Sequence, residues 1–359
     1  MTGLPRIVHL ASGREWRGGQ RQVLLLAREL GRRGLNQVVI TTAGSRLATE
    51  LAEAGIPAHP VDWRSGLSPK ALVAAIAETA KARSILHAHD AHALTLAGLT
   101  SLVSRAPVVV TRRANLPLRR RGFWSRASAV IAISEAVRRT LIGDGIDPAR
   151  ISLIHSGIDL EEAADVRPGG IKAELHLPPA GPLAVCVAAL TREKDHTTLL
   201  RTAARLHPRF SELHWALAGD GPLRTELEDL ARDLGVAPVI HFLGPVSDPR
   251  RLIAAATLFV LCSAQEGLGT SVLDALALGV PVVATRVGGI PEILDGGAGI
   301  LADQGDPAAL AEAVAQVVGS HELRSQLAAQ GRKSVTRFTD HGMATKVIQV
   351  YRSIVLERW

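Results

Sequence analysis

The sequence predicts an α/β protein made of two doubly wound domains, each with a parallel sheet. Short apolar runs that read as buried strands alternate with amphipathic helical runs along the chain, a pattern typical of parallel sheets covered by helices. At 359 residues the chain is longer than one ordinary hydrophobic core requires. Several strand-like runs also end at glycine turns, and open α/β sheets bind ligands beyond the carboxyl ends of their strands.

The first half supplies five predicted strands and five predicted helices. The strands are expected at residues 7–10, 37–41, 85–88, 108–111 and 130–133. The helices are expected at residues 19–33, 45–54, 69–82, 91–104 and 135–144. Val23, Leu26, Ala27 and Leu30 form the apolar stripe of the first helix at the spacing of a helix face.

The second half repeats the alternation after an expected linker at residues 160–172, which contains charged residues and a Pro-Gly-Gly sequence. Its strands are expected at residues 184–187, 214–218, 240–242, 258–262 and 280–284. Its helices are expected at residues 197–206, 223–234, 250–256, from about 270, and at 307–318, 322–336 and 342–356. We therefore expect domains at residues 1–165 and 166–340, with the helix of residues 341–359 crossing back to the first domain.

Composition narrows the class of protein. Cys186 and Cys262 lie in strand-like runs at a spacing that fits no metal motif, which is typical of a reducing compartment. The N-terminal residues lack the apolar core of a signal peptide, and no apolar run of about 18 residues is present. The sequence predicts a cytoplasmic protein, and it leaves open a peripheral position on the inner face of the cytoplasmic membrane.

Positive charge is concentrated in the first half. Residues 1–160 carry 22 Lys and Arg against 11 Asp and Glu, a net charge of +11, whereas the rest of the chain carries 19 against 23, a net of −4. An anionic partner for the first half is therefore expected. The sharpest cluster is Arg119–Trp124 (RRRGFW), which suits a phospholipid surface or an acidic acceptor, or is simply a solvated face. No nucleic-acid reading module is recognisable, so no nucleic-acid partner is expected.

The most informative segment runs from Ser263 to Glu292. A strand-like run is followed by Glu266, Gly267, Leu268 and Gly269, and a helix then opens near Thr270 and Ser271. A helix N-terminus after small residues offers unpaired N–H groups and a positive dipole end to a phosphate. Glu266 and Asp274 suit sugar or ribose hydroxyls. The alternative is an ordinary turn capped by Thr270 or Ser271.

Two further constellations lie in the first half. Gly18-Gly19 follows the first strand and opens the first helix, where glycine allows a phosphate or sugar to approach the backbone. The sequence is not the GxGxxG dinucleotide fingerprint. Arg113 follows a buried strand, a costly position for a cation that does not meet an anion. A tight loop is the alternative for the two glycines.

Histidines and cations mark two other strand ends. His87 and His89 lie on one face of a strand. Because spacing reveals no third ligand, we expect one histidine to contact substrate rather than the pair to hold a metal. Arg192 and Lys194 lie between the first strand and helix of the second half, where they could neutralise a departing diphosphate.

Taken together, these residues resemble the retaining glycosyltransferases of the GT-B fold, glycosyltransferase family 4, over almost the whole chain. The matching strings, besides Gly18-Gly19, are residues 131–135 (IAISE), 154–159 (IHSGID), 218–223 (AGDGPL), 242–244 (FLG), the E-x7-E segment at 266–274, 279–284 (GVPVVA) and 288–292 (GGIPE). The resemblance implies two Rossmann-like domains facing across a cleft. The first would lie on the acceptor side, the second would bind a nucleotide sugar, and the C-terminal helix would pack back towards the first.

The resemblance also implies roles for individual residues. Catalytic contacts are predicted for Glu266, Arg113 and His89. Donor contacts are predicted for Gly18, Gly19, Gly219, Arg192, Lys194, Gly267, Leu268, Gly269, Thr270, Ser271 and Asp274.

Three departures from the family pattern bear on the donor. Asp274 stands where a glutamate is usual. Ala188-Ala189 replaces the usual Gly-Arg pair, so that Arg192 is the candidate substitute. Arg113 stands where many members have a histidine.

The expected activity is a retaining, metal-independent transfer of a hexose-like sugar from a nucleoside diphosphate sugar to an acceptor hydroxyl. The acceptor would be a glycan or a lipid-linked molecule of the bacterial envelope or lipopolysaccharide, and an anionic membrane surface is a further expected partner. No cofactor or metal is expected. The alternatives are a non-catalytic nucleotide-sugar-binding protein and a sugar-nucleotide epimerase of similar fold.

Overall fold

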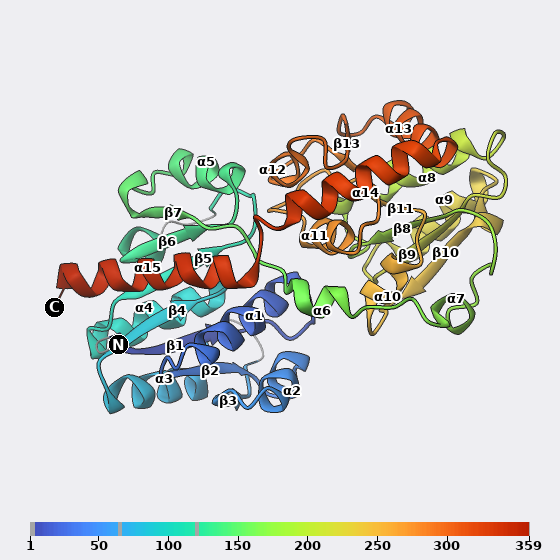
Figure 1. Ribbon diagram of the computed structural model, residues 1–359. Coiled ribbons are helices and arrows are strands. Elements are labelled where there is room, and N and C mark those ends of the chain that lie inside the picture. The colour runs from blue at the N-terminus through green and yellow to red at the C-terminus, as the bar shows by residue number, and fades with distance from the viewer. Residues whose placement is uncertain (1–3, 64–66, 119–121, 359) are drawn as a thin grey trace. The chain divides into compact units, whose positions relative to one another are not determined.

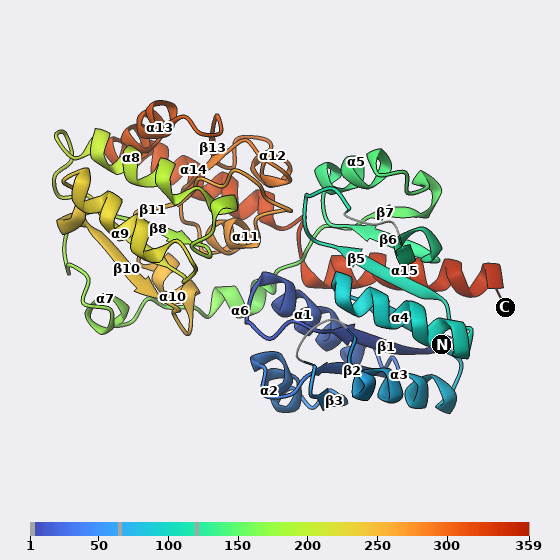
Figure 2. The ribbon, with the colours of Figure 1, turned by 180° about the vertical axis from the view of Figure 1, so that it is seen from behind.

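The computed structural model describes residues 4–63, 67–118 and 122–358 (Figures 1 and 2). The chain divides into two compact units, the first made of Met1–Ile158 with Thr339–Trp359 and the second of Asp159–Phe338. The basic-aromatic cluster predicted at Arg119–Trp124 lies partly outside the described residues, because positions 119–121 are not among them.

The first unit contains one parallel sheet in the order β3-β2-β1-β4-β5-β6-β7. Its strands are β1 (Arg6–Ala11), β2 (Gln37–Thr42), β3 (Ala58–Val61), β4 (Ser84–Ala88), β5 (Val108–Arg112), β6 (Ala129–Ala132) and β7 (Ile151–Leu153). The central strands β1, β2 and β4 are buried apart from Arg6 at the start of β1, and most of their buried residues are apolar. This composition suits strands covered on both faces.

The helices of the first unit cover both faces of that sheet, with α1 and α15 on one side and α3 and α4 on the other (Figures 1 and 2). They are α1 (Gly18–Arg32), α2 (Arg46–Glu53), α3 (Pro69–Lys81), α4 (Ala91–Ser104), α5 (Glu135–Gly143) and α15 (Asp340–Arg358), with the 3-10 turns η1 (Gly122–Arg126) and η2 (Pro148–Arg150). Ser45, Ser68, Asp90 and Ser134 cap α2 to α5 by accepting from a first-turn amide, which explains where these helices begin.

The C-terminal helix α15 completes the core of the first unit, as the sequence predicted. Tyr351 is fully buried, and its hydroxyl lies 2.6 Å from Nδ1 of His87 on β4. The apolar residues packed together here come from α1, the sheet and α15, among them Ile7, Leu26, Leu30, Ile85, Val347, Ile348 and Ile354. The last helix of the chain is therefore part of the first unit's hydrophobic core.

The second unit contains a six-stranded parallel sheet in the order β10-β9-β8-β11-β12-β13. Its strands are β8 (Leu183–Val187), β9 (His214–Ala218), β10 (Ile240–Gly244), β11 (Leu258–Leu261), β12 (Val282–Thr285) and β13 (Ile300–Ala302). Its helices are α6 (Leu160–Ala164), α7 (Ile171–Glu174), α8 (His196–Leu206), α9 (Arg224–Asp233), α10 (Pro249–Ala254), α11 (Thr270–Ala277), α12 (Ile290–Leu294), α13 (Pro307–Gly319) and α14 (His321–Val335), with η3 (Arg192–Lys194) and η4 (Ala237–Val239).

The boundary between the units differs from the expected one at residue 165. Ile158 bridges to Thr339, and the amide of Asp340 donates to the carbonyl of Ile158 at 3.1 Å. These contacts hold both crossing segments in the first unit. The segment expected as a linker instead folds as α6 and α7, which contact α11 and α10 of the second unit.

The sequence pattern did not predict three of the strands, β3, β7 and β13. All three lie at an edge of a sheet and have only three or four residues. Edge strands are often short and half exposed, and β3 contains Pro60, which is tolerated at an edge. Such runs are too short to show a strand period. Among the described residues, no helix is both long enough and apolar enough to cross a bilayer.

Both strand orders reverse direction at one point, between β1 and β4 in the first sheet and between β8 and β11 in the second. Connections leave these neighbouring strands towards opposite faces, so that a crevice opens beyond their carboxyl ends. The residues that follow β1, β4, β8 and β11 are therefore the ones that the fold makes available to a ligand.

We predict that the buried Tyr351 anchors α15. Tyr351→Ala should lower the free energy of unfolding by about 3–5 kcal/mol, because a large buried ring is lost. Tyr351→Phe should lower it by about 1 kcal/mol, because only the hydrogen bond to His87 is lost. Urea denaturation measures both values. The control is Leu356→Ala at an 85% exposed position of the same helix, and a loss in Tyr351→Ala no larger than in this control would contradict the role.

Candidate functional site

The first candidate site lies at the reversal point of the second sheet. The turn after β8 contains Lys194, the turn after β11 contains Glu266, and the two side chains form an ion pair. The carbonyl of Glu193 accepts from the amides of Ala264 and Gln265 at 2.9 and 3.0 Å, which ties the two turns together. A cation and a carboxylate that the sequence separates by 72 positions are thus placed side by side.

Glu266 is held in place from several directions. Its carboxylate accepts from Ser263 Oγ at 3.3 Å and from the amide of Gly267 at 3.1 Å. The Ser263 carbonyl in turn accepts from Thr285 Oγ1 at 2.7 Å, so that the end of β12 supports the same turn. A Cβ on Gly288 would lie 1.8 Å from the Glu266 carbonyl oxygen, which leaves room only for glycine there. The glycine turn after β12 therefore lets the backbone pack closely behind Glu266.

The helix that follows, α11, begins at Thr270 without a side-chain cap. Its N-cap residue is Gly269, in the left-handed conformation at φ 91°, and its first turn contains no acid. The cap by Thr270 or Ser271 that the sequence left open is not the arrangement found, because Thr270 is already the first helical residue. The Gly269 carbonyl accepts from the amide of Val272 at 2.9 Å. Because Gly269 has no side-chain oxygen to cap the other first amides, the positive end of α11 is available to an anion.

Asp274 lies on the second turn of α11 and is 6% exposed. Arg250 on α10 is the nearby cation. Burial lowers the pKa of Arg250, but its hydrogen bond with Glu162 and the charges of Glu162, Asp248 and Asp274 together raise it above the ordinary value. Asp274 therefore has an electrostatic neighbour in the protein, which the sequence did not reveal.

Gly219 and Arg192 occupy different surroundings from Lys194. Gly219 has φ 142°, and a Cβ there would lie 2.0 Å from the Ala188 carbonyl oxygen. Its amide donates to the Gly244 carbonyl at 2.8 Å. Gly219 therefore allows the chain segments at the carboxyl ends of β8, β9 and β10 to approach one another closely. Arg192 is exposed in the same 3-10 turn as Lys194. A donor contact by either residue stays a prediction.

The second candidate site lies at the reversal point of the first sheet. Gly18 and Gly19 open α1, whose N-cap Arg17 makes no side-chain cap and whose first turn contains no acid. Arg113 follows β5 and lies against this turn, with its Cδ 3.5 Å from the position that a Cβ on Gly19 would take. The helix opening and the arginine predicted from sequence are therefore adjacent.

The Arg113 guanidinium has only part of its charge and hydrogen-bonding capacity satisfied within the protein. Its Nε is buried without a hydrogen-bond partner. Burial lowers the pKa of Arg113 to about 10, and the charge of Asp90 opposes the shift. Asp90 itself is committed to other groups, since it accepts from Ser12 N and Oγ at 2.8 and 2.7 Å and caps α4. A buried cation with an unpaired donor can accept an anionic ligand.

Beneath Arg113 lie three buried histidines: His9, His87 and His89. Nδ1 of His9 is 3.0 Å from Nε2 of His89, and His87 lies between Tyr351 Oη at 2.6 Å and Thr111 Oγ1 at 2.8 Å. Burial lowers the pKa of His9 to about 4. Burial and the neighbouring charges, including that of Arg113, lower the pKa of His87 and His89 well below the ordinary value. All three rings are therefore neutral at pH 7.

The cluster supplies the third histidine that spacing alone could not identify. Nitrogens of His9, His87 and His89 lie within 4.8 Å of one another, close enough to share one ion. Two features disfavour a cation here. Both nitrogens of His87 already have hydrogen-bond partners, and the Arg113 charge acts on His87 and His89. The geometry fits a hydrogen-bonded core cluster better than a metal centre.

Of the three histidines, His89 is the best candidate for contact with a substrate. It is 5% exposed, and its Nδ1 is buried without a partner. His9 holds the opposite nitrogen, which fixes the ring. His9 was not predicted as a site residue, because its place beside His87 depends on the parallel register of β1 and β4. Substrate contact by His89 stays a prediction.

Comparisons with known proteins agree with this architecture. The family model described as Glycosyl transferases group 1 matches residues 171–334, and that of Glycosyltransferase Family 4 matches residues 16–162. The alpha-maltose-1-phosphate synthase of Mycobacterium tuberculosis is 31% identical over 314 residues, which covers 78% of this chain and 81% of the relative.

Two further comparisons cover different parts of the chain. The lipopolysaccharide core biosynthesis glycosyltransferase LpsE of Rhizobium meliloti is 34% identical over 184 residues, which is 51% of this chain and 53% of LpsE. Among solved structures, Anabaena HepE in complex with UDP-glucose has a TM-score of 0.85 at 21% identity, and covers 97% of this chain and 100% of that protein. The last likeness concerns the fold, which is that of GT-B glycosyltransferases.

The buried histidines predict a loss of stability on acidification. In the unfolded chain a histidine takes up its proton near pH 6.5, whereas His9 in the folded protein stays neutral down to about pH 4. Below pH 6.5 the unfolded state thus binds more protons, and stability falls as pH falls towards 4, by up to about 1.4 kcal/mol per pH unit for each such histidine.

Urea denaturation at pH 7 and pH 5 measures this effect. His9→Gln should reduce the difference in the free energy of unfolding between pH 7 and pH 5, because one histidine with a lowered pKa is removed. His92→Gln, at an exposed position of α4, should leave it unchanged. The same pH dependence in His9→Gln as in the parent protein would contradict the assignment.

Proposed function

This chain belongs to the glycosyltransferases of group 1 and family 4, and from that membership we propose that it transfers a hexose-like sugar from a nucleoside diphosphate sugar to an acceptor hydroxyl. The observation that carries the proposal is the pairing of Lys194 with Glu266 beside the uncapped start of α11, at the reversal point of the second sheet. This segment lies within the stretch matched by the group 1 model.

The diphosphate of the donor would bind to the positive groups of this site. Lys194 and the first amides of α11, at Thr270 and Ser271, supply charge and N–H donors. Without ligand, Glu266 neutralises Lys194. A diphosphate would compete for the ammonium group and release the Glu266 carboxylate to accept from sugar hydroxyls. The Asp274 side chain is one methylene group shorter than the usual glutamate, and it would accept from the ribose hydroxyls directly or through water.

The proposed reaction retains the anomeric configuration. The bond between the anomeric carbon and the diphosphate oxygen breaks, and the acceptor oxygen forms a bond to the same face of that carbon. The acceptor proton passes to the departing phosphate oxygen. Positive charge at the leaving group lowers the barrier, since it stabilises charge that grows during the step. Lys194 and the α11 amides can supply this charge, so a divalent ion is not required in the proposal.

A polar envelope glycan or a lipid-linked molecule is the proposed acceptor. The support is the relationship to LpsE, whose name assigns it to lipopolysaccharide core biosynthesis. Within the first unit, the proposed ligand contacts are the opening of α1 at Gly18-Gly19 and Arg113, whose Nε lacks a partner. His89 of the adjacent histidine cluster is a further proposed contact. The proposed location is the cytoplasm.

The first test identifies the donor and removes the proposed site. Nucleotide sugars of uridine, guanosine, adenosine and thymidine are screened for thermal stabilisation of the protein, because a ligand of the native state raises the melting temperature. With the donor so found, Glu266→Gln should lower kcat/KM by about 100-fold or more, and Lys194→Met by a similar factor, since each removes a charged group from the site.

The control for these variants is Asp303→Asn in the same unit, where the side chain is 83% exposed. It should leave kcat/KM unchanged. Donor turnover in Glu266→Gln equal to that of the parent would exclude the proposed site. Donor binding without turnover in the parent protein would favour a non-catalytic binding protein, and formation of an epimerised donor without acceptor would favour an epimerase.

The second test concerns stereochemistry and metal. Proton NMR of the initial product should show the same anomeric configuration as the donor sugar. Activity should persist in EDTA, because the leaving diphosphate meets Lys194 and backbone amides. An inverted product would refute the retaining mechanism, and activity that is lost in EDTA and restored by Mg²⁺ or Mn²⁺ would refute metal independence.

A further inference from the structure

The last turn of α4 presents an unusual apolar surface. Leu102 is 64% exposed and Val103 is 69% exposed, and the two are neighbours in the chain. The other large apolar side chains of comparable exposure among the described residues are scattered singly: Leu67, Val73, Leu116 and Leu356. Single exposed apolar residues need no explanation, whereas here two neighbouring side chains expose apolar surface at one end of a helix.

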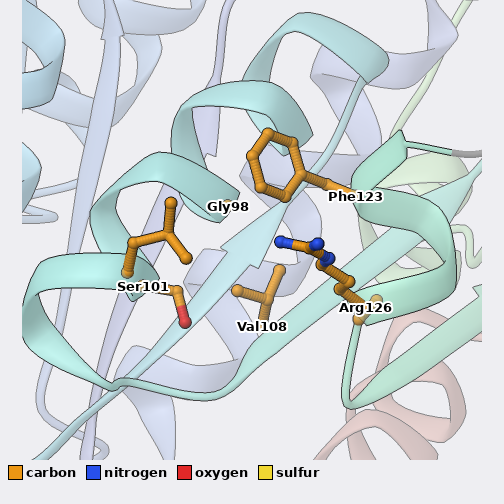
Figure 3. A pocket seen from close by; sticks show the side chains of 7 residues that line it. Gly98, Ser101, Val108, Phe123 and Arg126 are labelled. Carbon is orange, nitrogen blue, oxygen red and sulfur yellow. The ribbon is translucent and has the colours of Figure 1, made fainter.

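Two arginines flank this pair. Arg105 lies two residues beyond Val103, in the left-handed conformation at φ 58°. Arg126 lines one hollow together with Leu102 and Phe123 (Figure 3). Both arginines are exposed, and neither has a carboxylate within ion-pair distance among the described residues. From Ala91 to Ser134 the sequence contains seven arginines and no acidic residue. The positive charge of this surface is therefore uncompensated.

The aromatic residues of the predicted cluster play a different part from the one expected. Trp124 is 7% exposed. The Arg112 guanidinium lies over the Trp124 ring, with its Cζ 5.4 Å from the ring centre. The Phe123 ring packs on Gly98 of α4, where a Cβ would lie 2.2 Å from it. In Figure 3 Phe123 and Arg126 both extend from η1 towards α4. Phe123 thus packs η1 against α4, which places Arg126 in the same hollow as Leu102 of the exposed apolar pair.

We propose that this surface, formed by Leu102, Val103, Arg105 and Arg126, docks on an anionic phospholipid membrane. The apolar pair would enter the boundary between head groups and acyl chains, and the arginines would contact lipid phosphates. A membrane suits the surface better than a protein partner. Two apolar side chains are far fewer than the roughly 20–30 residues a side of a stable protein interface, whereas uncompensated arginines around a small apolar tip match an anionic plane.

The docking surface lies away from the candidate site of the first unit. Val108 is the first residue of β5 and Ala127 precedes β6, and both line the hollow. The surface is therefore at the amino-terminal edge of the first sheet, whereas Gly19 and Arg113 are at the carboxyl-terminal edge. Substitutions in the surface should consequently leave donor binding intact, and the docking can fail without refuting the proposed transferase activity.

Vesicle flotation tests the proposal with the full chain. The protein should float with vesicles of phosphatidylcholine mixed with phosphatidylglycerol, but not with phosphatidylcholine alone, and added salt should weaken the binding. The double variant Leu102→Asp/Val103→Asp should lower the partition coefficient about tenfold or more, since the two apolar side chains that would enter the membrane are lost. Arg126→Glu should also lower it about tenfold.

Matched variants separate docking from general effects. Val73→Asp changes a 67% exposed valine on α3, and Arg139→Glu changes an exposed arginine on α5; both should bind vesicles as the parent does. Donor-induced thermal stabilisation should be equal in all variants.

Absence of binding to anionic vesicles would overturn the proposal, as would equal binding by the surface variants and their controls. Self-association that is abolished in Leu102→Asp/Val103→Asp, without vesicle binding by the parent, would assign the surface to a second copy of the chain instead.

Discussion

The reversal of strand order within each sheet is the constraint on which the candidate sites depend. Between β8 and β11 it brings together the turn with Lys194 and the turn with Glu266, and between β1 and β4 it brings together Gly19, Arg113 and His89. Parallel strands direct their carboxyl ends to one edge, so residues from distant parts of the chain meet there. Each unit thus contains polar groups at the place where its own fold exposes them.

The ion pair between Lys194 and Glu266 gives the second unit a balanced site before any ligand binds. A half-buried carboxylate without a cation, or a cation without a carboxylate, would be costly at this depth. A diphosphate can take the place of the Glu266 carboxylate, because the Lys194 ammonium group then exchanges one anionic partner for another. The first unit is arranged differently, since Arg113 has a buried donor without a partner and lies over three neutral histidines.

Much of this could be predicted from the sequence. Long central strands and amphipathic helices have a clear period, and the Ser263–Glu292 segment of the sequence indicates the candidate site of the second unit. The rest depends on tertiary contacts. The edge strands β3, β7 and β13 are too short to show a period, His9 becomes notable only through its register with His87, and the partner of Asp274 on α10 is distant in sequence. Trp124, expected at the surface, is buried because η1 folds against α4.

The most direct test of the account is hydrogen–deuterium exchange of the full chain with and without the nucleoside diphosphate that stabilises it. If the diphosphate binds at the reversal point of the second sheet, the slowed amides will lie in residues 191–196 and 263–274, where the backbone N–H groups would contact phosphate. If these two segments exchange equally with and without ligand while others are protected, the site assigned to Lys194, Glu266 and the start of α11 is wrong.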